Sequence, residues 1–176
     1  IKESYGSSFD ESLNKYLNTI IRSAERMAKL IDDLLSFSRL SHVNSMLEEV
    51  NLTSIVNGVL DDLEILIKEK QATIIYENLP VIKGSPLQLT QVFQNLLSNA
   101  LKFSHPHRKP FIKINATQIS QDEILYDKIS FQDNGIGFSP AHSQKIFEVF
   151  QRLHSRDEFE GTGVGLAIVK KGVSLH

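Results

Sequence analysis

The chain has 176 residues and a formal net charge of −2; 41% of its residues are hydrophobic and 23% are charged. This composition is typical of a folded globular protein, and its charge does not favour binding to nucleic acid or to an anionic membrane surface. The chain has no cysteine and no apolar run near the ~18 residues of a membrane span, which excludes a disulfide framework, thiolate metal sites and a membrane-crossing helix.

The first predicted element is a long amphipathic helix. Ser8 and Glu11 have the spacing of a capping box, which predicts that the helix begins at Ser8. Apolar or small residues then recur every three or four positions. They are Leu13, Leu17, Ile20, Ala24, Met27, Ile31, Leu34 and Ser38, and the stripe is broadened by Ile21, Ala28, Leu30, Leu35 and Phe37.

A helix of about 30 residues with one wide apolar face is not stable alone in water. We therefore expect this face to be covered by a partner helix from outside the chain, or by a second copy of the chain in a homodimer. The alternative is that the helix lies on the domain that follows it. The polar residues 41–45 predict a hinge, which divides the chain into residues 1–45 and 46–176.

Helices and strands mix beyond the hinge. We predict short strands near residues 50–52, 72–76 and 82–84, and longer alternating strands at 111–117 and 124–131. Helices are predicted at 53–69, from Ser85-Pro86 onward, and from about 163 to 173, with a further short segment at 145–150. The pattern predicts an α+β chain, in which a long helix precedes an α/β sandwich with helices on one face of a mixed sheet.

The helix that begins after Ser85 contains the sequence QVFQNLLSNALKFS at residues 91–104. Its apolar residues form one continuous face. Asn95, Asn99 and Lys102 fall within an arc of about 60° on the polar side, although asparagine is a poor helix former. These three side chains either form a ligand site or only face solvent, and this stretch alone does not decide between the two.

Two glycine-rich segments follow. Residues 133–138 (DNGIGF) come directly after a predicted strand, so that Asp133 could accept hydrogen bonds from a ligand; the alternative is a simple Asn-Gly turn. Residues 161–166 (GTGVGL) lead into the last helix and would expose backbone N–H groups at its positive end, where a phosphate could bind. The segment is neither a Walker loop nor a dinucleotide-binding motif.

Taken in order, these motifs resemble those of the sensor histidine kinases. QVFQNLLSNALKFS resembles the N box, DNGIGF the first glycine box, FEVFQRL the F box and GTGVGLAIV the second glycine box. Residues 25–41 (ERMAKLIDDLLSFSRLS) resemble the second helix of the dimerization and histidine-phosphotransfer domain, most similarly in phytochrome-like and PAS-linked kinases. The resemblance covers about residues 4–176. It implies the Bergerat (GHKL) ATP-binding fold that these kinases share with gyrase, MutL and the heat-shock chaperone ATPases.

The resemblance also implies roles for individual residues, with ATP and Mg²⁺ as cofactors. Asn99 matches the asparagine that binds Mg²⁺, Asn95 matches its partner one turn earlier, and Asp133 matches the carboxylate that accepts the adenine amino group. The other implied nucleotide-binding residues are Lys102 near the phosphates, Phe103 beside the adenine, Gly135 and Gly137 in the adenine pocket, Phe147 and Phe150 as anchors of the lid, Arg152 toward the γ-phosphate, and Gly161, Thr162, Gly163, Val164, Gly165 and Leu166 around the phosphates.

The reaction is indicated by Asn95. The hydrolysing relatives carry a glutamate four residues before the metal asparagine, and an amide cannot act as a general base near neutral pH. We therefore expect a poor hydrolase that transfers the γ-phosphate to a separate nucleophile. No catalytic residue is expected in the chain itself, because its histidines, at positions 42, 105, 107, 142, 154 and 176, do not match the acceptor histidine of the family.

The leading interpretation is a fragment of a cytoplasmic histidine kinase that works as a homodimer with the receiver domain of a response regulator as its partner. We expect a fragment because the chain lacks an initiator Met at Ile1 and the final strands that the resemblance implies after His176. Two alternatives stay open. The chain could be a catalytically silent nucleotide-binding scaffold, or an ATPase of the gyrase or chaperone type.

Overall fold

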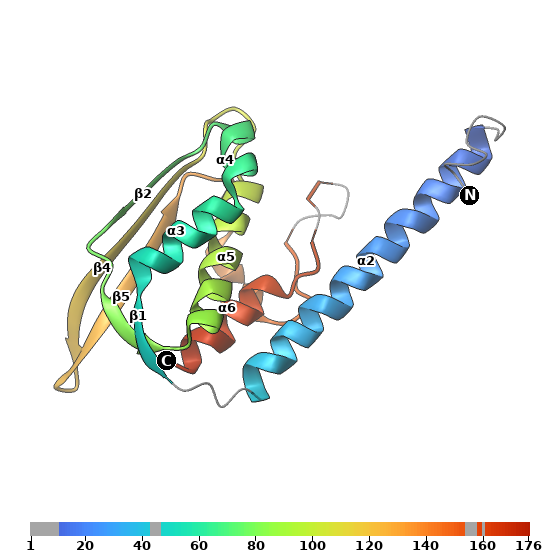
Figure 1. The fold of residues 1–176 in the computed structure, drawn as a ribbon. Coiled ribbons are helices and arrows are strands. Elements are labelled where there is room, and N and C mark those ends of the chain that lie inside the picture. Colours follow the sequence, from blue (N-terminus) through green and yellow to red (C-terminus); the bar gives the residue numbers. More distant parts are fainter. Residues whose placement is uncertain (1–10, 43–46, 154–157, 160) are drawn as a thin grey trace.

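The computed structural model describes residues 11–42, 47–153, 158–159 and 161–176. Figure 1 shows a long helix, α2 (Glu11–His42), that runs beside an α/β domain made of all the later elements. The predicted helix is confirmed, but the predicted N-cap at Ser8 and most of the predicted hinge lie outside the described residues.

The larger sheet of the α/β domain has three strands in the order β2-β4-β5. Strand β2 (Thr73–Glu77) is parallel to β4 (Phe111–Gln121), with Thr73 opposite Phe111, and β4 is antiparallel to β5 (Ile124–Asp133). This is the predicted mixed sheet. Strands β4 and β5 extend well past the end of β2 and form a long hairpin, visible at the lower left of Figure 1.

The helices of the α/β domain lie on one face of this sheet (Figure 1). They are α3 (Leu52–Asp62), α4 (Glu64–Lys70), α5 (Pro86–Lys102) and α6 (Gly165–Ser174). Side chains alternate along β4, where Ile112 and Ile114 are buried against the helices. The core between the two layers also contains Val50, Leu52, Val56, Val59, Leu89, Phe93, Leu97 and Leu101. This arrangement is the predicted sandwich with helices on one face.

A second, two-stranded sheet pairs β1 (Glu48–Asn51) with β3 (Val81–Gly84) in antiparallel fashion. The side chain of Asn51 ends β1 and caps α3, because its Oδ1 accepts hydrogen bonds from the backbone N–H groups of Thr53, at 2.9 Å, and Ser54, at 3.4 Å. The single helix predicted at 53–69 is wrong in one respect. The helix is interrupted at Leu63, because the backbone of this residue (φ −98°, ψ 5°) leaves the helical region. Leu63 therefore separates α3 from α4.

Helix α5 begins as predicted. Ser85 is its N-cap and Pro86 occupies the first turn, and the backbone N–H of Gln88 donates to Ser85 Oγ at 3.5 Å. Helix α6 crosses α5 closely, because a Cβ atom added at Gly172 would lie only 2.5 Å from Val92 Cγ2. The glycine that interrupts α6 in the sequence therefore marks the contact between the two helices.

The carboxyl end of α2 contacts α6. Phe37 packs against a small cluster that contains Val164 and Ile168. The rest of α2 extends away from the α/β domain (Figure 1), and Ile20, Met27 and Ile31 on it stay more than half exposed. The expected contact with the following domain is therefore present at the carboxyl end of α2, and the expected cover of the apolar face by a partner helix or a second copy stays a prediction. In the ranges that the structure covers, no helix combines the length and the apolar character needed to cross a membrane.

Candidate functional site

A cavity of about 1120 Å³ lies between α5, the loop after β5, the segment before α6, and α2. Most of the nucleotide-binding residues that the sequence predicted line this cavity. They are Asn95, Asn99, Lys102, Phe103, Asp133, Gly137, Phe147, Arg152, Gly161, Thr162, Gly163, Gly165 and Leu166. Gly135, Phe150 and Val164 are not part of the lining. The fold therefore brings together side chains from segments that are far apart in the sequence.

The polar face of α5 meets the amino end of α6. Asn95 Nδ2 donates to the backbone carbonyl of Gln91 at 2.8 Å, which directs Oδ1 toward Gly165, where an added Cβ atom would lie 2.6 Å away. The same Cβ position lies 3.8 Å from Asn99 Nδ2. Both amides are thus adjacent to the first residue of α6, and only glycine fits between them.

The amino end of α6 carries no side-chain cap. The first hydrogen bond of its first turn joins the N–H of Ile168 to the carbonyl of Val164 at 3.0 Å. The N–H groups before Ile168 point toward the end of the helix, where the helix dipole is positive. Their direction and the neighbouring amides make this end of the cavity suitable for an anion.

The loop after β5 is held in place by its own carboxylate. The backbone N–H of Gly135 donates to Asp133 Oδ1 at 2.8 Å, and the N–H of Ile136 donates to the carbonyl of Phe103 at 3.0 Å. A side chain at residue 135 would collide with that carbonyl, because an added Cβ atom would lie 2.6 Å from it. The second oxygen of Asp133 is the one left for a ligand in the cavity. Gly135 thus shapes the site without lining it.

Asn134 has a structural role that the sequence did not reveal. Its Oδ1 accepts a hydrogen bond from the backbone N–H of Phe111 at 2.8 Å, and its Nδ2 donates to the carbonyl of Lys109 at 3.0 Å. The side chain therefore fixes the loop that joins α5 to β4. The only signal in the sequence was the Asn-Gly pair, which we interpreted as a turn residue or part of a ligand loop.

The segment between the two glycine motifs, which we call the lid, includes two short turns, η1 (Pro140–His142) and η2 (Lys145–Phe147). Phe147 lines the cavity, whereas the side chain of Phe150 is 55% exposed and lies outside it. The N–H of Phe150 donates to the carbonyl of Gly163 at 3.0 Å, so the backbone of Phe150 is what ties the lid to the second glycine motif.

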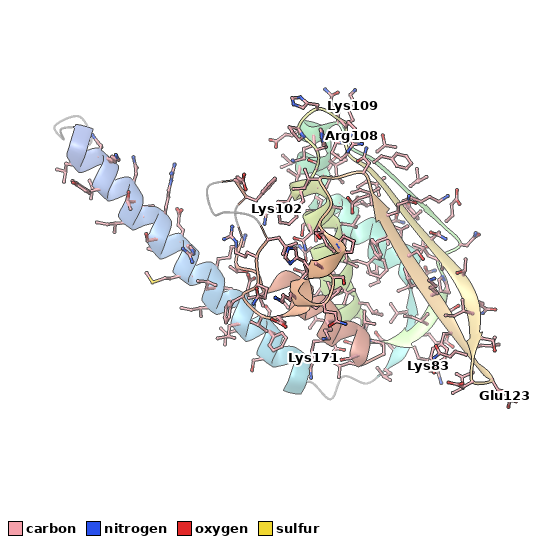
Figure 2. The ribbon with its side chains drawn as sticks, turned by 180° about the vertical axis from the view of Figure 1, so that it is seen from behind. Lys83, Lys102, Arg108, Lys109, Glu123 and Lys171 are labelled. Atoms are coloured by element: carbon pink, nitrogen blue, oxygen red, sulfur yellow. The ribbon has the colours of Figure 1, made fainter. Side chains whose placement is uncertain are left out.

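Arg152 and Lys102, two of the cationic side chains that line the cavity, lie at the end of the lid. The guanidinium of Arg152 donates to the carbonyls of Gly161, at 2.7 Å, and Phe159, at 2.5 Å. Phe159 packs against Phe103 with the two rings tilted by 50° and their centroids 5.0 Å apart, and Lys102 Nζ lies 4.4 Å from the centroid of the Phe103 ring. In Figure 2, Lys102 lies on the side of the cavity, whereas Arg108 and Lys109 lie at the outer end of the loop after α5.

Two residues of α2 also line the cavity, Lys29 and Asp33, and no motif in the sequence predicts them there. The hydroxyl of Thr162 donates a hydrogen bond to the Asp33 carboxylate. We had assigned the whole of α2 to a dimer interface or to a surface packed on the next domain. No periodic pattern marks a contact between residues so far apart in the chain.

Two protein families match the chain, and one of them covers most of the residues that line the cavity. The family described as "Histidine kinase-, DNA gyrase B-, and HSP90-like ATPase" matches residues 84–176, which carry most of the residues that line the cavity. The family described as "His Kinase A (phospho-acceptor) domain" matches residues 2–43. Together the two matches cover α2 and the second half of the α/β domain.

Two phytochromes are similar to the chain over almost its whole length. The chain is 37% identical over 172 residues to cyanobacterial phytochrome A of Nostoc sp., and 36% identical over 172 residues to phytochrome-like protein Cph1 of Synechocystis sp.. Each alignment covers 98% of this chain and 22% of the relative. The chain therefore spans about a fifth of the length of these relatives.

Solved structures share the fold. The mycobacterial sensor histidine kinase MprB is 27% identical, with a TM-score of 0.58, and the match covers 74% of this chain and 80% of that one. Full-length ShkA, solved in complex with AMPPNP, is 24% identical, with a TM-score of 0.67 over 97% of this chain and 35% of that one. The latter match includes α2 as well as the α/β domain.

Proposed function

The chain belongs to the sensor histidine kinases, a branch of the histidine kinase-, DNA gyrase B- and HSP90-like ATPases, and from this premise we propose that it binds Mg·ATP. In the whole protein, the γ-phosphoryl group is transferred to a histidine that lies outside this chain. An aspartate in the receiver domain of a response regulator then takes the phosphoryl group.

The observation that carries this proposal is the meeting of the Asn95 and Asn99 amides with the uncapped amino end of α6 in one cavity. Backbone N–H groups at a helix amino end bind phosphate oxygens. Nucleotide affinity needs such donors in a concave site, and the cavity of about 1120 Å³ is large enough to hold a nucleotide.

The residues fit a magnesium ion that is bound mainly by its nucleotide. Mg²⁺ in phosphate-transfer sites takes one or two protein oxygens, and waters and phosphate oxygens supply the rest. Asn99 offers an amide oxygen within the cavity, and the Asn95 amide lies one turn away on the same face of α5. The metal would neutralise charge on the phosphates, while the protein orients them.

The residues also fit an adenine base. Asp133 has one oxygen bonded to Gly135 and the other available to accept a hydrogen bond from an exocyclic amino group. Phe103 lines the same cavity, where its ring also contacts Lys102 and Phe159. Asp133 and Phe103 would hold the base, and the backbone N–H groups at the amino end of α6 would hold the phosphates.

Transfer to a separate nucleophile is favoured over hydrolysis because Asn95 occupies the position of the base. Its amide nitrogen is bonded to the carbonyl of Gln91, and an amide cannot accept a proton from water near neutral pH. Loss of a general base costs about 10²–10⁴ in rate. The site therefore binds ATP and hydrolyses it only slowly, so that the γ-phosphoryl group stays available for transfer to a histidine.

We further propose that α2 forms a homodimer interface. The phospho-acceptor domain match covers this helix, and its apolar residues Ile20, Met27 and Ile31 are exposed in the single chain. A second copy would cover them.

A calorimetric titration of the chain with Mg·ATP tests the proposal. Asn99→Ala removes the metal-facing amide, so we expect the dissociation constant for Mg·ATP to rise about tenfold or more. Asn57→Ala is the matched control, because Asn57 is an exposed residue of α3 that does not line the cavity, and it should leave the affinity unchanged. Failure of the unmodified chain to bind Mg·ATP would contradict the proposal.

A second measurement separates the kinase from its alternatives. The chain is mixed with radiolabelled ATP and a separate helix that carries an acceptor histidine. Label on that histidine supports the kinase. Binding without transfer favours a silent scaffold, and steady release of phosphate well above background favours an ATPase.

A further inference from the structure

Three residues of α2 form a single face toward the α/β domain. Lys29, Asp33 and Phe37 are spaced by four residues, which places them within an arc of about 80° on the helix. Phe37 packs against Val164 and Ile168, and the hydroxyl of Thr162 donates to the Asp33 carboxylate. Lys29 and Asp33 line the same cavity as the predicted nucleotide-binding residues. The helix is thus a wall of that cavity.

We propose that Asp33 is a positioning residue for the nucleotide, acting through Thr162. By holding the Thr162 hydroxyl, Asp33 sets the backbone of residues 161–165, and Lys29 adds its ammonium group to the wall that faces the phosphates. The proposal rests on the function proposed above. It adds that a helix outside the ATP-binding domain completes the nucleotide site.

The backbone around Thr162 explains why such a hold is needed. Gly161 and Gly163 have φ angles of 144° and 78°, which side chains disfavour and which glycine leaves weakly restrained. Thr162 is the one residue between them with a side chain, so it is the point at which neighbouring structure can fix the segment. A segment that is already ordered loses less conformational entropy when it binds phosphate.

The charges of the two residues favour a joint role for Asp33 and Lys29 over a role for Asp33 alone. A carboxylate that lines a phosphate site repels the ligand. Asp33 is offset by the hydrogen bond from Thr162 and by Lys29 one turn earlier on the same face of α2. This wall of the cavity therefore combines Asp33, which accepts the hydrogen bond from the Thr162 hydroxyl, with Lys29, whose positive charge attracts the phosphates.

A double-mutant cycle on the whole chain tests the role of Asp33. Thr162→Val is introduced both into the unmodified chain and into Asp33→Ala, and the dissociation constant for Mg·ATP is measured by calorimetry. The cycle cancels the direct effect of removing the Asp33 charge. Thr162→Ser keeps the hydroxyl, and Asp32→Asn changes an exposed neighbour that does not line the cavity.

We expect Thr162→Val to raise the dissociation constant about three- to tenfold when Asp33 is present and less than about twofold when it is absent. Thr162→Ser should keep the coupling to Asp33 that Thr162→Val loses, and Asp32→Asn should bind as the unmodified chain does. Equal effects in both backgrounds, or a lower melting temperature with no change in affinity, would overturn the proposal. Absence of ATP binding by the unmodified chain would instead overturn the proposed function.

Lys29 is tested by comparing nucleotides. Lys29→Gln should weaken the binding of ATP more than that of ADP, because the difference between the two ligands is the terminal phosphate. Lys15→Gln, a change on the same helix outside the cavity, should affect neither. Equal losses for ATP and ADP, or no loss for either, would overturn the assignment of Lys29 to the phosphate side.

Discussion

Asp133 shows how one hydrogen bond gives a side chain its direction. Because Oδ1 accepts from the N–H of Gly135 at 2.8 Å, the carboxylate cannot rotate freely, and we infer that the other oxygen is available to a ligand in the cavity that Asp133 lines. That oxygen can only accept a hydrogen bond. A base with an amino group at the facing position is matched, and a base with a carbonyl there is repelled.

We predict that Asp133→Asn changes both affinity and base preference. If the amide oxygen keeps the bond from Gly135, the amide nitrogen faces the ligand as a donor, so the affinity for ATP should fall about 10- to 100-fold. The affinity for GTP relative to ATP should rise. Competition binding measures both. Asp127→Asn, an exposed carboxylate on β5, is the control, and an unchanged ratio of the two affinities would contradict the prediction.

The sequence identified residues of the site where a periodic pattern exposed them. The pattern drew attention to Asn95 and Asn99 as two amides on one face of an amphipathic helix, and to Asp133 as the end of a strand before glycines, but their roles came from the resemblance to the histidine kinases. Asp33 left no such mark. Its partner Thr162 lies 129 residues further along the chain, and an aspartate on the polar side of a long helix is unremarkable by itself.

At the scale of elements, two glycines in helices have opposite meanings. In α6, a Cβ atom at Gly172 would lie 2.5 Å from Val92 Cγ2, whereas at Gly58 in α3 nothing lies within 4 Å. Helix propensity counts a glycine at either position as destabilising to the helix. Only the structure shows that Gly172 is required for α5 and α6 to cross.

We predict that Gly58→Ala stabilises the chain by about 1 kcal/mol, from helix propensity alone. Gly172→Ala gains the same propensity but forces a methyl group against Val92, which costs about 1–3 kcal/mol, so its net effect should be destabilising or near zero. Urea unfolding measures the difference between the two variants. Val92→Ala should relieve Gly172→Ala in part, and equal stabilisation by both glycine changes would show that the helix crossing is not tight.

The errors in the predicted elements have local causes. The sequence around Leu63 contains no glycine or proline, so nothing in it indicated the break between α3 and α4. The strands β4 and β5 are longer than predicted because Asp122 and Glu123 form a two-residue turn with φ angles of 51° and 65°. Such turns usually contain glycine, and its absence hid the full length of the hairpin.

At the scale of the whole molecule, α2 presents two different faces, an exposed apolar stripe and a side that lines the cavity. Ile31 lies about 160° around the helix from Asp33 and Ile20 about 140°, so the exposed apolar stripe points away from the cavity. One face can therefore contact a second copy while the other contacts the α/β domain. The sequence predicted both environments as alternatives, because periodicity alone does not show that they occupy different sides.

We predict that Ile31→Glu weakens self-association of the chain, because it places a charge in the exposed apolar stripe, where Ile31 is 58% exposed. Sedimentation velocity over a range of concentrations should show a shift toward the monomer. Lys15→Glu lies on the opposite side of α2 and should have little effect. An unmodified chain that stays monomeric at every concentration would contradict the proposed homodimer.

The single-ended attachment of α2 has a mechanical consequence. The helix has 32 residues, and the 22 residue-to-residue steps from Glu11 to Asp33 span about 33 Å at 1.5 Å per step. If α2 tilts about its contacts at Asp33 and Phe37, a tilt of about 10° moves its far end by about 6 Å. A movement imposed at that end would therefore act on the contact of Asp33 with Thr162, which lies at the wall of the cavity.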